Sequence, residues 1–380
     1  MTTLDLPAAV PALGPAVSPE RRRRLGGVTG PEVATLVGAA VGSLALDWLL
    51  YERLLPLSGA QGFLFCWYLL FLAFCYALGS LQWDRLTVRE RLVTVVAWSA
   101  GLLLVVLIVE QLVFVTMRGL PAAIHGNFFT QTMEHTSALS PITSGGVLHA
   151  VVGSLEQLGL ATLFAVPLGI ATAVFLSEVG GRTARPVRTL VEAMTALPSI
   201  VAGLFVLGVV ILTLGVESSG FAASLALTVM MMPIVTRAAE VVIRLVPGTL
   251  REASYALGGS QWRTVWNVVL PTARPGLATA VILGMARGVG ETSPVLLTAG
   301  FTARLNADPF TGHQVSLPLY IWNYVRQPYP DMIARGFAAG LTLMALVLVL
   351  FVAARLLGGR RPGELTRRQR RAISRQEGGR

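Results

Sequence analysis

Residues 252–271 read EASYALGGSQWRTVWNVVLP, a polar and helix-forming stretch between two long apolar segments. Gly258 and Gly259 divide it, because a glycine pair ends a helix and turns the chain. Thr249 and Ser260 are suitable N-caps for one helix on each side of this turn. The stretch therefore predicts two short helices at a membrane surface. Their apolar and aromatic side chains would either fill a groove on a partner protein or hold the segment against lipid.

The rest of the chain has the composition of a membrane protein. Hydrophobic residues make up 54% of the 380 residues and charged residues only 13%, with a mean hydropathy of +0.66, so lipid is the expected solvent. Runs of about 20 apolar residues are long enough to cross a hydrocarbon core of about 30 Å. The predicted fold class is therefore all-α, a polytopic membrane helix bundle. Its expected spans are 33–51, 62–82, 92–117, 149–177, 189–214, 219–243, 277–300 and 332–357.

The distribution of charge predicts how these spans are oriented. All 30 basic residues are arginine, and the net charge is +10. The arginines gather in every second connecting segment, so the positive-inside rule places both termini and the loop 244–276 in the cytoplasm, with the protein in a bacterial inner membrane. Residues 1–31 are expected to be a disordered cytoplasmic lead. The basic tail 358–380 is expected to contact anionic lipid, and no nucleic-acid partner is predicted.

Missing residue types exclude several chemistries. The chain has no lysine, and a P-loop needs a lysine on the nucleotide phosphates, so any ATP would have to be hydrolysed by another polypeptide. The four histidines and two cysteines show no metal-ligand spacing, and no nucleophile–base set is visible. We therefore expect no catalytic residue, no metal site and no cofactor in this chain, which is not predicted to be an enzyme.

Four ionisable residues lie at membrane depth, where they are costly and therefore functional candidates. Arg287 and Glu291 are four residues apart and can pair along one helix face, while Arg237 and Glu240 lie in the preceding span. The functional interpretation is a polar translocation path, in which the planar fork of each Arg binds an oxyanion and a Glu holds each Arg. The alternative is a set of internal salt bridges that never meet a substrate. Arg237 and Glu240 lie near enough to the interface to reach it.

The stretch 252–271 also resembles the coupling loop, named after its Glu-Ala-Ala motif, of permease subunits in binding-protein-dependent ATP-driven (ABC) importers. Glu-Ala-Ser is followed after three residues by Gly258, and after nine more by Val268 and then Leu-Pro. The resemblance implies that the tip of this loop inserts into a separate ATPase subunit. Ser stands where the family usually has the second Ala, a small-for-small change. The residues that receive this coupling role are Glu252, Ala253, Ser254, Gly258, Leu270 and Pro271.

Further segments resemble the A-type permease (PstA) family of phosphate importers. They are ALPSIVAGLF at 196–205, MPIVTRAAEVVIRLVP at 232–247 and ARGVGETSPVLLTAG at 286–300. The family implies a type I importer (MetI-like) core of six spans within 92–357, including the coupling loop 247–276. Two accessory spans in 32–91 depart from the family pattern, and the sequence assigns them no role.

The resemblance also implies a set of partners. The family imports inorganic phosphate as a complex of such a chain with a homologous second permease subunit (PstC-like). Two copies of a cytoplasmic ATPase (PstB-like) would bind ATP and Mg²⁺, and an external phosphate-binding protein (PstS-like) would dock on the external loops 118–148 and 301–331. Another oxyanion, such as molybdate or phosphonate, is the nearest alternative substrate. A proton-coupled secondary transporter using Arg287 and Glu291 is a further alternative, although it would have no use for a coupling loop.

Overall fold

The computed structural model describes residues 30–54 and 59–358, and every regular element in these ranges is helical. The predicted all-α fold class is thereby confirmed for this part of the chain. The predicted lead 1–31 and tail 358–380 lie outside it, except for residues 30, 31 and 358. The chain divides into two compact units, residues 1–109 and 110–380, and the long helix α3 (Arg85–Ala123) contributes to both. The predicted boundary between accessory spans and importer core, at residues 91 and 92, stays a prediction.

The described part of unit 1 is helical. It contains α1 (Gly30–Trp48), the π-helical turn η1 (Leu49–Leu54), α2 (Ala60–Gln82) and the first part of α3. Val88 of α3 packs against Gly79 of α2. A Cβ added at Gly79 would lie 3.5 Å from both methyl groups of Val88. The hydroxyl groups of Tyr68 and Ser99 form a 2.6 Å hydrogen bond further along the same two helices. These two contacts hold α3 beside α2 at two levels.

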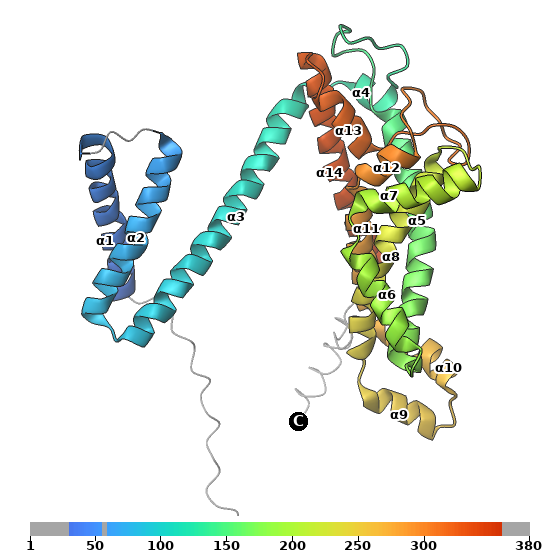
Figure 1. Ribbon diagram of the computed structural model, residues 1–380, viewed down its shortest axis with the longest axis horizontal. Helices are drawn as coiled ribbons and strands as arrows, with labels where there is room; N and C mark the ends of the chain where they lie inside the picture. The colour runs from blue at the N-terminus through green and yellow to red at the C-terminus, as the bar shows by residue number, and fades with distance from the viewer. Residues whose placement is uncertain (1–29, 55–58, 359–380) are drawn as a thin grey trace, which may run out of the picture. The chain divides into compact units, whose positions relative to one another are not determined.

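Unit 2 contains the remaining elements (Figure 1). They are α4 (Gly126–Thr130), α5 (Leu148–Val174), η2 (Phe175–Val179), α6 (Ala184–Ala196), α7 (Ser199–Val206), η3 (Leu207–Thr213), α8 (Gly220–Arg244), α9 (Gly248–Ala256), α10 (Gln261–Thr264), η4 (Val265–Val269), α11 (Leu270–Val289), α12 (Ser293–Thr298), α13 (Leu317–Val325) and α14 (Pro330–Gly358). Figure 1 shows α9 and α10 at one end of this unit, called here the coupling end, and α4 at the opposite end.

Helix α8 is the centre of unit 2 and packs against α5, α6, α7, α11 and α12. Small residues allow these close approaches. A Cβ on Gly284 of α11 would lie 2.5 Å from Val235 of α8, and one on Gly288 would lie 2.5 Å from Met231. The Gly-x-x-x-Gly spacing in α11 therefore lets two spans pack closely, because in lipid it is van der Waals contact that drives helix association. This packing fixes α8, which carries Arg237 and Glu240, and α11, which carries Arg287 and ends just before Glu291.

Within residues 30–54 and 59–358, seven helices are long and apolar enough to cross a membrane, or eight if one bent pair counts as a span. The bent pair corrects the prediction of one span at 189–214, since α6 and the α7–η3 helix meet at an angle of 106°. The physical reason is Pro198, whose ring excludes the preceding residue from the helical region. Leu197 accordingly is extended, with φ −66° and ψ 130°.

The span predicted at 277–300 is also wrong in its bounds. The helix runs from Gln261 to Val289, because α10, η4 and α11 are continuous. Pro271 lies directly after the π-helical turn η4, at the start of α11, and the helix continues through it. The chain leaves the helix at Gly290 and forms the separate helix α12, which packs against α7 and α8. Glu291 lies directly after this break and is therefore not part of α11.

Candidate functional site

The coupling end of unit 2 presents an exposed pair of helices. Gly258 ends α9 and turns the chain with φ +79°, a conformation that favours glycine. Ser260 then caps α10 by accepting a hydrogen bond from the amide of Arg263, as predicted. The predicted cap at Thr249 is wrong, because α9 already begins at Gly248 after Pro247. A proline at this position sets the φ of the helix entrance without any side-chain cap.

Apolar side chains project from this pair of helices. Leu257 is 90% exposed and Trp262 is 67% exposed, and Trp266 stacks edge-on against Trp262 with ring centroids 5.5 Å apart. Glu252 and Ala253, two predicted tip residues, are exposed on α9. Exposed aromatic anchors of this kind are enriched at protein interfaces. The surface formed by α9, α10 and their turn is called here the coupling surface.

The other predicted coupling residues lie inside the structure. Ser254 is half-buried and its hydroxyl is 2.8 Å from the hydroxyl of Thr264, so it joins the two helices of the coupling surface. Leu270 packs against the buried cluster that includes Ala239 and Ile243 of α8. Pro271 is exposed, but it lies in the first turn of α11 and not in a loop. The structure thus places Glu252, Ala253 and Gly258 at the surface and gives Ser254 and Leu270 internal contacts.

An ion pair that the sequence analysis missed anchors α9 to the bundle. Arg251 donates from Nε to both carboxylate oxygens of Glu178 at 3.2 Å, and from Nη2 to Oε1 at 2.7 Å. It also donates to the carbonyl oxygens of Val246 at 2.7 Å and Ile243 at 3.0 Å. The Glu178 side chain is 6% exposed and that of Arg251 20% exposed. No local spacing could reveal this pair, because 73 residues separate its members.

The predicted pair in α11 is present and confirmed. Arg287 Nη2 lies 3.0 Å from Glu291 Oε1, with the Arg side chain 53% exposed and the Glu side chain 9% exposed. The buried carboxylate therefore holds the guanidinium, which has further N–H donors besides the one in this pair. Arg287 also lines a cavity of about 40 Å³ with Met230 and Ile234 of α8, beside the break between α6 and α7. Such a cavity has room for a few water molecules.

The two predicted path residues of α8 form ion pairs with residues of α6. Arg237 pairs with Glu192 at 3.2 Å. Glu240 accepts from Arg188 at 2.7 Å, and also from Arg244, one turn further along α8, at 2.6 Å. Arg188 and Glu192 are not among the predicted path residues. They reach α8 because α6 packs against it, which no spacing within a single span can show.

The three arginine–glutamate groups lie at successive levels along α8. Arg287 is beside Met230 and Ile234, and Arg237 follows on the same face of α8, since positions i, i+4 and i+7 align on a helix. The third group, around Glu240, is nearer the coupling end. From residue 230 to 244 the helix rises about 20 Å, at about 1.5 Å per residue. Half-exposed guanidinium groups thus recur over much of a bilayer's depth.

The opposite end of unit 2 joins the loops 118–148 and 301–331. The amide of Met133 donates to the carbonyl oxygen of Ala303 at 3.2 Å, and Arg304 pairs with Glu134 at 3.1 Å. Arg335 of α14 is 0% exposed and donates from Nη2 to the carbonyl oxygens of Ser140, Pro141 and Ser144, at 3.1, 2.6 and 3.0 Å. This buried arginine fastens the first loop to α14. Leu139, Leu305 and Phe310 project from the two loops as exposed apolar side chains.

Burial also shifts the pKa of Tyr324 at this end of the bundle. Desolvation raises the pKa of Tyr324 in α13 to about 12, although the positive charge of Arg335 acts in the opposite direction. Tyr320, one turn away, has its ring centroid 4.3 Å from that of Tyr324. Among the residues that the structure describes, no three His, Cys, Asp or Glu side chains are placed to share a metal ion.

Comparison with known proteins agrees with this architecture. The family described as "Binding-protein-dependent transport system inner membrane component" matches residues 165–361. The phosphate transport system permease protein PstA 1 of Mycobacterium tuberculosis H37Rv is 40% identical over 277 residues, covering 72% of this chain and 89% of the relative. PstA of Mycobacterium leprae is 40% identical over 73% of this chain and 92% of its own length. PstA of Pasteurella multocida is 31% identical over 63% and 83%.

One solved structure is similar to part of the chain. An inward-facing form of the methionine ABC transporter MetNI matches with a TM-score of 0.42 and 22% sequence identity, over 54% of this chain and 91% of that chain. The assignment of this chain to a family rests on the sequence matches. This chain belongs to the binding-protein-dependent transport system inner membrane components, and within them to the group of PstA permeases. It is an integral inner membrane protein and a transport component, and the predicted family is confirmed.

Proposed function

We propose that this chain is a permease subunit of an ATP-driven importer that carries inorganic phosphate into the cytoplasm. The observation that carries the proposal is the coupling surface, an exposed aromatic helix pair fastened to the bundle by Arg251 and Glu178. Its similarity to PstA permeases over about seven-tenths of the chain supports phosphate as the substrate. The proposal includes a cytoplasmic location for both termini and for the coupling surface, as the arginine distribution predicts.

The coupling surface would dock on a separate ATPase subunit that binds ATP and Mg²⁺. Glu252 and Ala253 would enter a cleft of that subunit, and Leu257 and Trp262 would fill apolar pockets around it. The anchor at Arg251 makes α9 move with the end of α5, because the ion pair joins the two rigidly. ATP-driven displacement of the docked helices would then be transmitted to the spans. A homologous second permease subunit would complete the membrane part of the complex.

The path would follow the arginine–glutamate groups along α8. Arg287 and Arg237 have half-exposed side chains, and each is held by a carboxylate, Glu291 and Glu192 respectively. A guanidinium so held keeps its remaining N–H groups for a phosphate oxyanion. Glu240 would position Arg188 and Arg244 at the inner end of the path. An external phosphate-binding protein would dock on the joined loops 118–148 and 301–331, where exposed apolar side chains gather.

Uptake of labelled phosphate at micromolar supply tests the proposal in a strain that lacks this gene. Wild type should restore uptake, whereas Glu252→Arg should insert normally, fail to retain the ATPase and fail to restore uptake. Glu90→Arg is the matched charge reversal at an exposed glutamate outside the coupling surface, and it should restore uptake fully. Restored uptake with Glu252→Arg would refute the coupling assignment. Unchanged phosphate uptake in the deletion strain would instead favour another oxyanion.

The path is tested separately by Arg287→Gln in the assembled complex. Uptake should fall by at least about tenfold while the ATPase remains bound, since a lost charge-assisted contact is worth about 1.5–3 kcal/mol. Arg274→Gln is the control, because Arg274 is an exposed arginine near the start of the same helix. Normal uptake by the Arg287→Gln complex would mean that this ion pair only holds the bundle together.

A further inference from the structure

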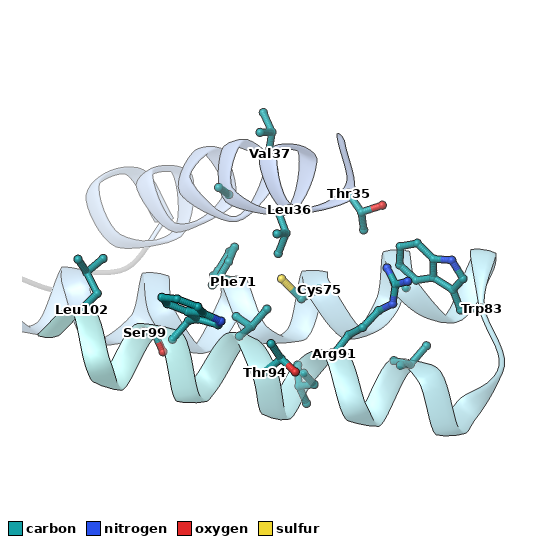
Figure 2. Close-up of a pocket in the computed structure, with 16 residues that line it drawn as sticks. Thr35, Leu36, Val37, Phe71, Cys75, Trp83, Arg91, Thr94, Ser99 and Leu102 are labelled. Carbon is teal, nitrogen blue, oxygen red and sulfur yellow. The ribbon is translucent and has the colours of Figure 1, made fainter. Parts of the chain in front are cut away.

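Two cavities among the described residues differ in the chemistry of their walls. The groove of unit 1, about 670 Å³ in volume, has largely apolar walls, with Leu36, Phe71 and Leu102 among them (Figure 2). The cavity of about 40 Å³ in unit 2 is lined by a cation, Arg287, and by a residue with a hydroxyl group, Thr195. A few polar groups of this kind are what gives a site its specificity. The second cavity therefore bears on the chemistry of the transported ion.

An ion pair extends the polar wall of this cavity along the contact between α6 and α8, called here the α6–α8 seam. Thr195 of α6 and Ile234 of α8 both line the cavity. Three residues before Thr195 lies Glu192, and three after Ile234 lies Arg237, with 3.2 Å between Glu192 Oε1 and Arg237 Nη1. Three residues are slightly less than one helical turn and rise about 4.5 Å, so the pair lies directly beside the cavity. Both of its side chains are half-exposed and can contact an ion at the cavity.

The polar groups along this seam are of two kinds, hydrogen-bond donors and hydrogen-bond acceptors. Arg287 and Arg237 can only donate, because a guanidinium has no acceptor atom. The ionised carboxylate of Glu192 can only accept, and its contact with Arg237 takes up one of its roughly four acceptor positions. The hydroxyl of Thr195 donates its one proton to the carbonyl oxygen of Val191 at 2.8 Å, so toward a bound ion it can only accept. A ligand that matches the seam therefore has both anionic oxygens and an O–H group.

Tetrahedral oxyanions differ in this respect. Near neutral pH hydrogen phosphate and arsenate have both anionic oxygens and a hydroxyl group, whereas sulfate and molybdate have anionic oxygens alone. A fully ionised oxyanion would place an acceptor against the carboxylate of Glu192, where like charges repel and no hydrogen bond forms. A site built to hydrogen-bond a substrate's O–H rejects an analogue without it, because the polar groups of the site are then left unpaired.

We propose that Glu192 is a specificity-determining residue of the transport path and selects an oxyanion that carries a proton. The inference rests on the proposed import of phosphate and deepens it. Arg287 and Arg237 bind the anionic oxygens, while Glu192, assisted by Thr195, accepts a hydrogen bond from the hydroxyl group of the phosphate. The same carboxylate also orients Arg237. This selection acts inside the membrane, independently of the external binding protein.

Phosphorus NMR of the full complex in mild detergent, without nucleotide and without the external binding protein, detects such a site even when binding is weak. The phosphate resonance should broaden when the wild-type complex is added, and the broadening that remains with Arg237→Gln is the background of other sites. At about pH 8.5 hydrogen phosphate and sulfate are both dianions and differ in the phosphate proton, so a change of protein charge affects both alike. With wild type, equimolar sulfate should leave the broadening in place.

Glu192→Gln keeps the size of the side chain and gives it an N–H donor. Sulfate should then compete about tenfold better relative to phosphate, the effect of one hydrogen bond to a charged group. Thr195→Val should change the ratio in the same direction by a smaller factor, and it supplies the test if Glu192→Gln does not assemble. Glu90→Gln neutralises an exposed glutamate outside the seam and should leave the ratio unchanged.

Three results would overturn the inference. They are a wild-type complex that broadens the phosphate resonance no more than Arg237→Gln does, sulfate that competes equally with phosphate for wild type, and a ratio that neither Glu192→Gln nor Thr195→Val changes. Phosphate uptake by cells with the wild-type gene decides the proposed function separately. Restored uptake together with an unchanged ratio would therefore refute the role of Glu192 alone.

Discussion

Replacement of Arg251 by Met should release α9 from the bundle, while the exposed side chains of the coupling surface stay the same. Arg251 donates to two atoms of Glu178 and to the carbonyl oxygens of Val246 and Ile243. Its removal leaves a carboxylate that is only 6% exposed without a cation. Breaking a buried ion pair by removing one partner costs about 3–5 kcal/mol, and the lower end applies because Arg251 is itself 20% exposed. About 3 kcal/mol corresponds to roughly 100-fold in the docking equilibrium of α9.

Hydrogen exchange of the backbone amides in α9 measures this equilibrium directly. Exchange in residues 248–256 should accelerate about 100-fold in Arg251→Met, and ATP-driven uptake should fall with it. Arg263→Met is the matched control, because Arg263 is an exposed arginine of the same surface. The double variant Glu178→Gln with Arg251→Met should recover part of the protection, since it leaves no buried charge unpaired. Unchanged exchange and uptake in Arg251→Met would refute the reasoning.

Two further predictions concern the opposite end of unit 2. Arg335→Met should lower stability by about 1–3 kcal/mol, because three backbone carbonyl oxygens lose their charged donor, and thermal unfolding in detergent should show this loss while Arg326→Met does not. Because of Tyr324, the free energy of unfolding should fall as pH rises from about 10 to about 12. The pKa of Tyr324 is raised in the folded state, so the folded phenol stays protonated after the unfolded one ionises near 10. Tyr324→Phe should lose less stability than wild type between pH 9 and pH 11, and equal losses would contradict a buried phenol.

Sequence alone determined the features that depend on local chemistry. Apolar runs of about 20 residues can only be satisfied in lipid as helices, so the all-α class followed from composition and length. The turn at Gly258, the cap at Ser260 and the pair between Arg287 and Glu291 each join residues at most four apart. Such contacts are set by helix geometry and require no knowledge of how the spans pack.

Tertiary structure decided everything that depends on which helices are neighbours. It gave Glu240 the partner Arg188 and gave Arg237 the partner Glu192, because α6 lies against α8. It fastened the coupling surface through the pair of Arg251 in α9 with Glu178 in η2, which lie 73 residues apart in the sequence. A charged side chain in a low-dielectric interior pairs with whatever opposite charge the packing brings near it. Sequence spacing therefore identified the charged residues of the candidate path and the local pair of Arg287 with Glu291. The packing of α6 against α8 decided that Arg237 pairs with Glu192 and that Arg188 reaches Glu240.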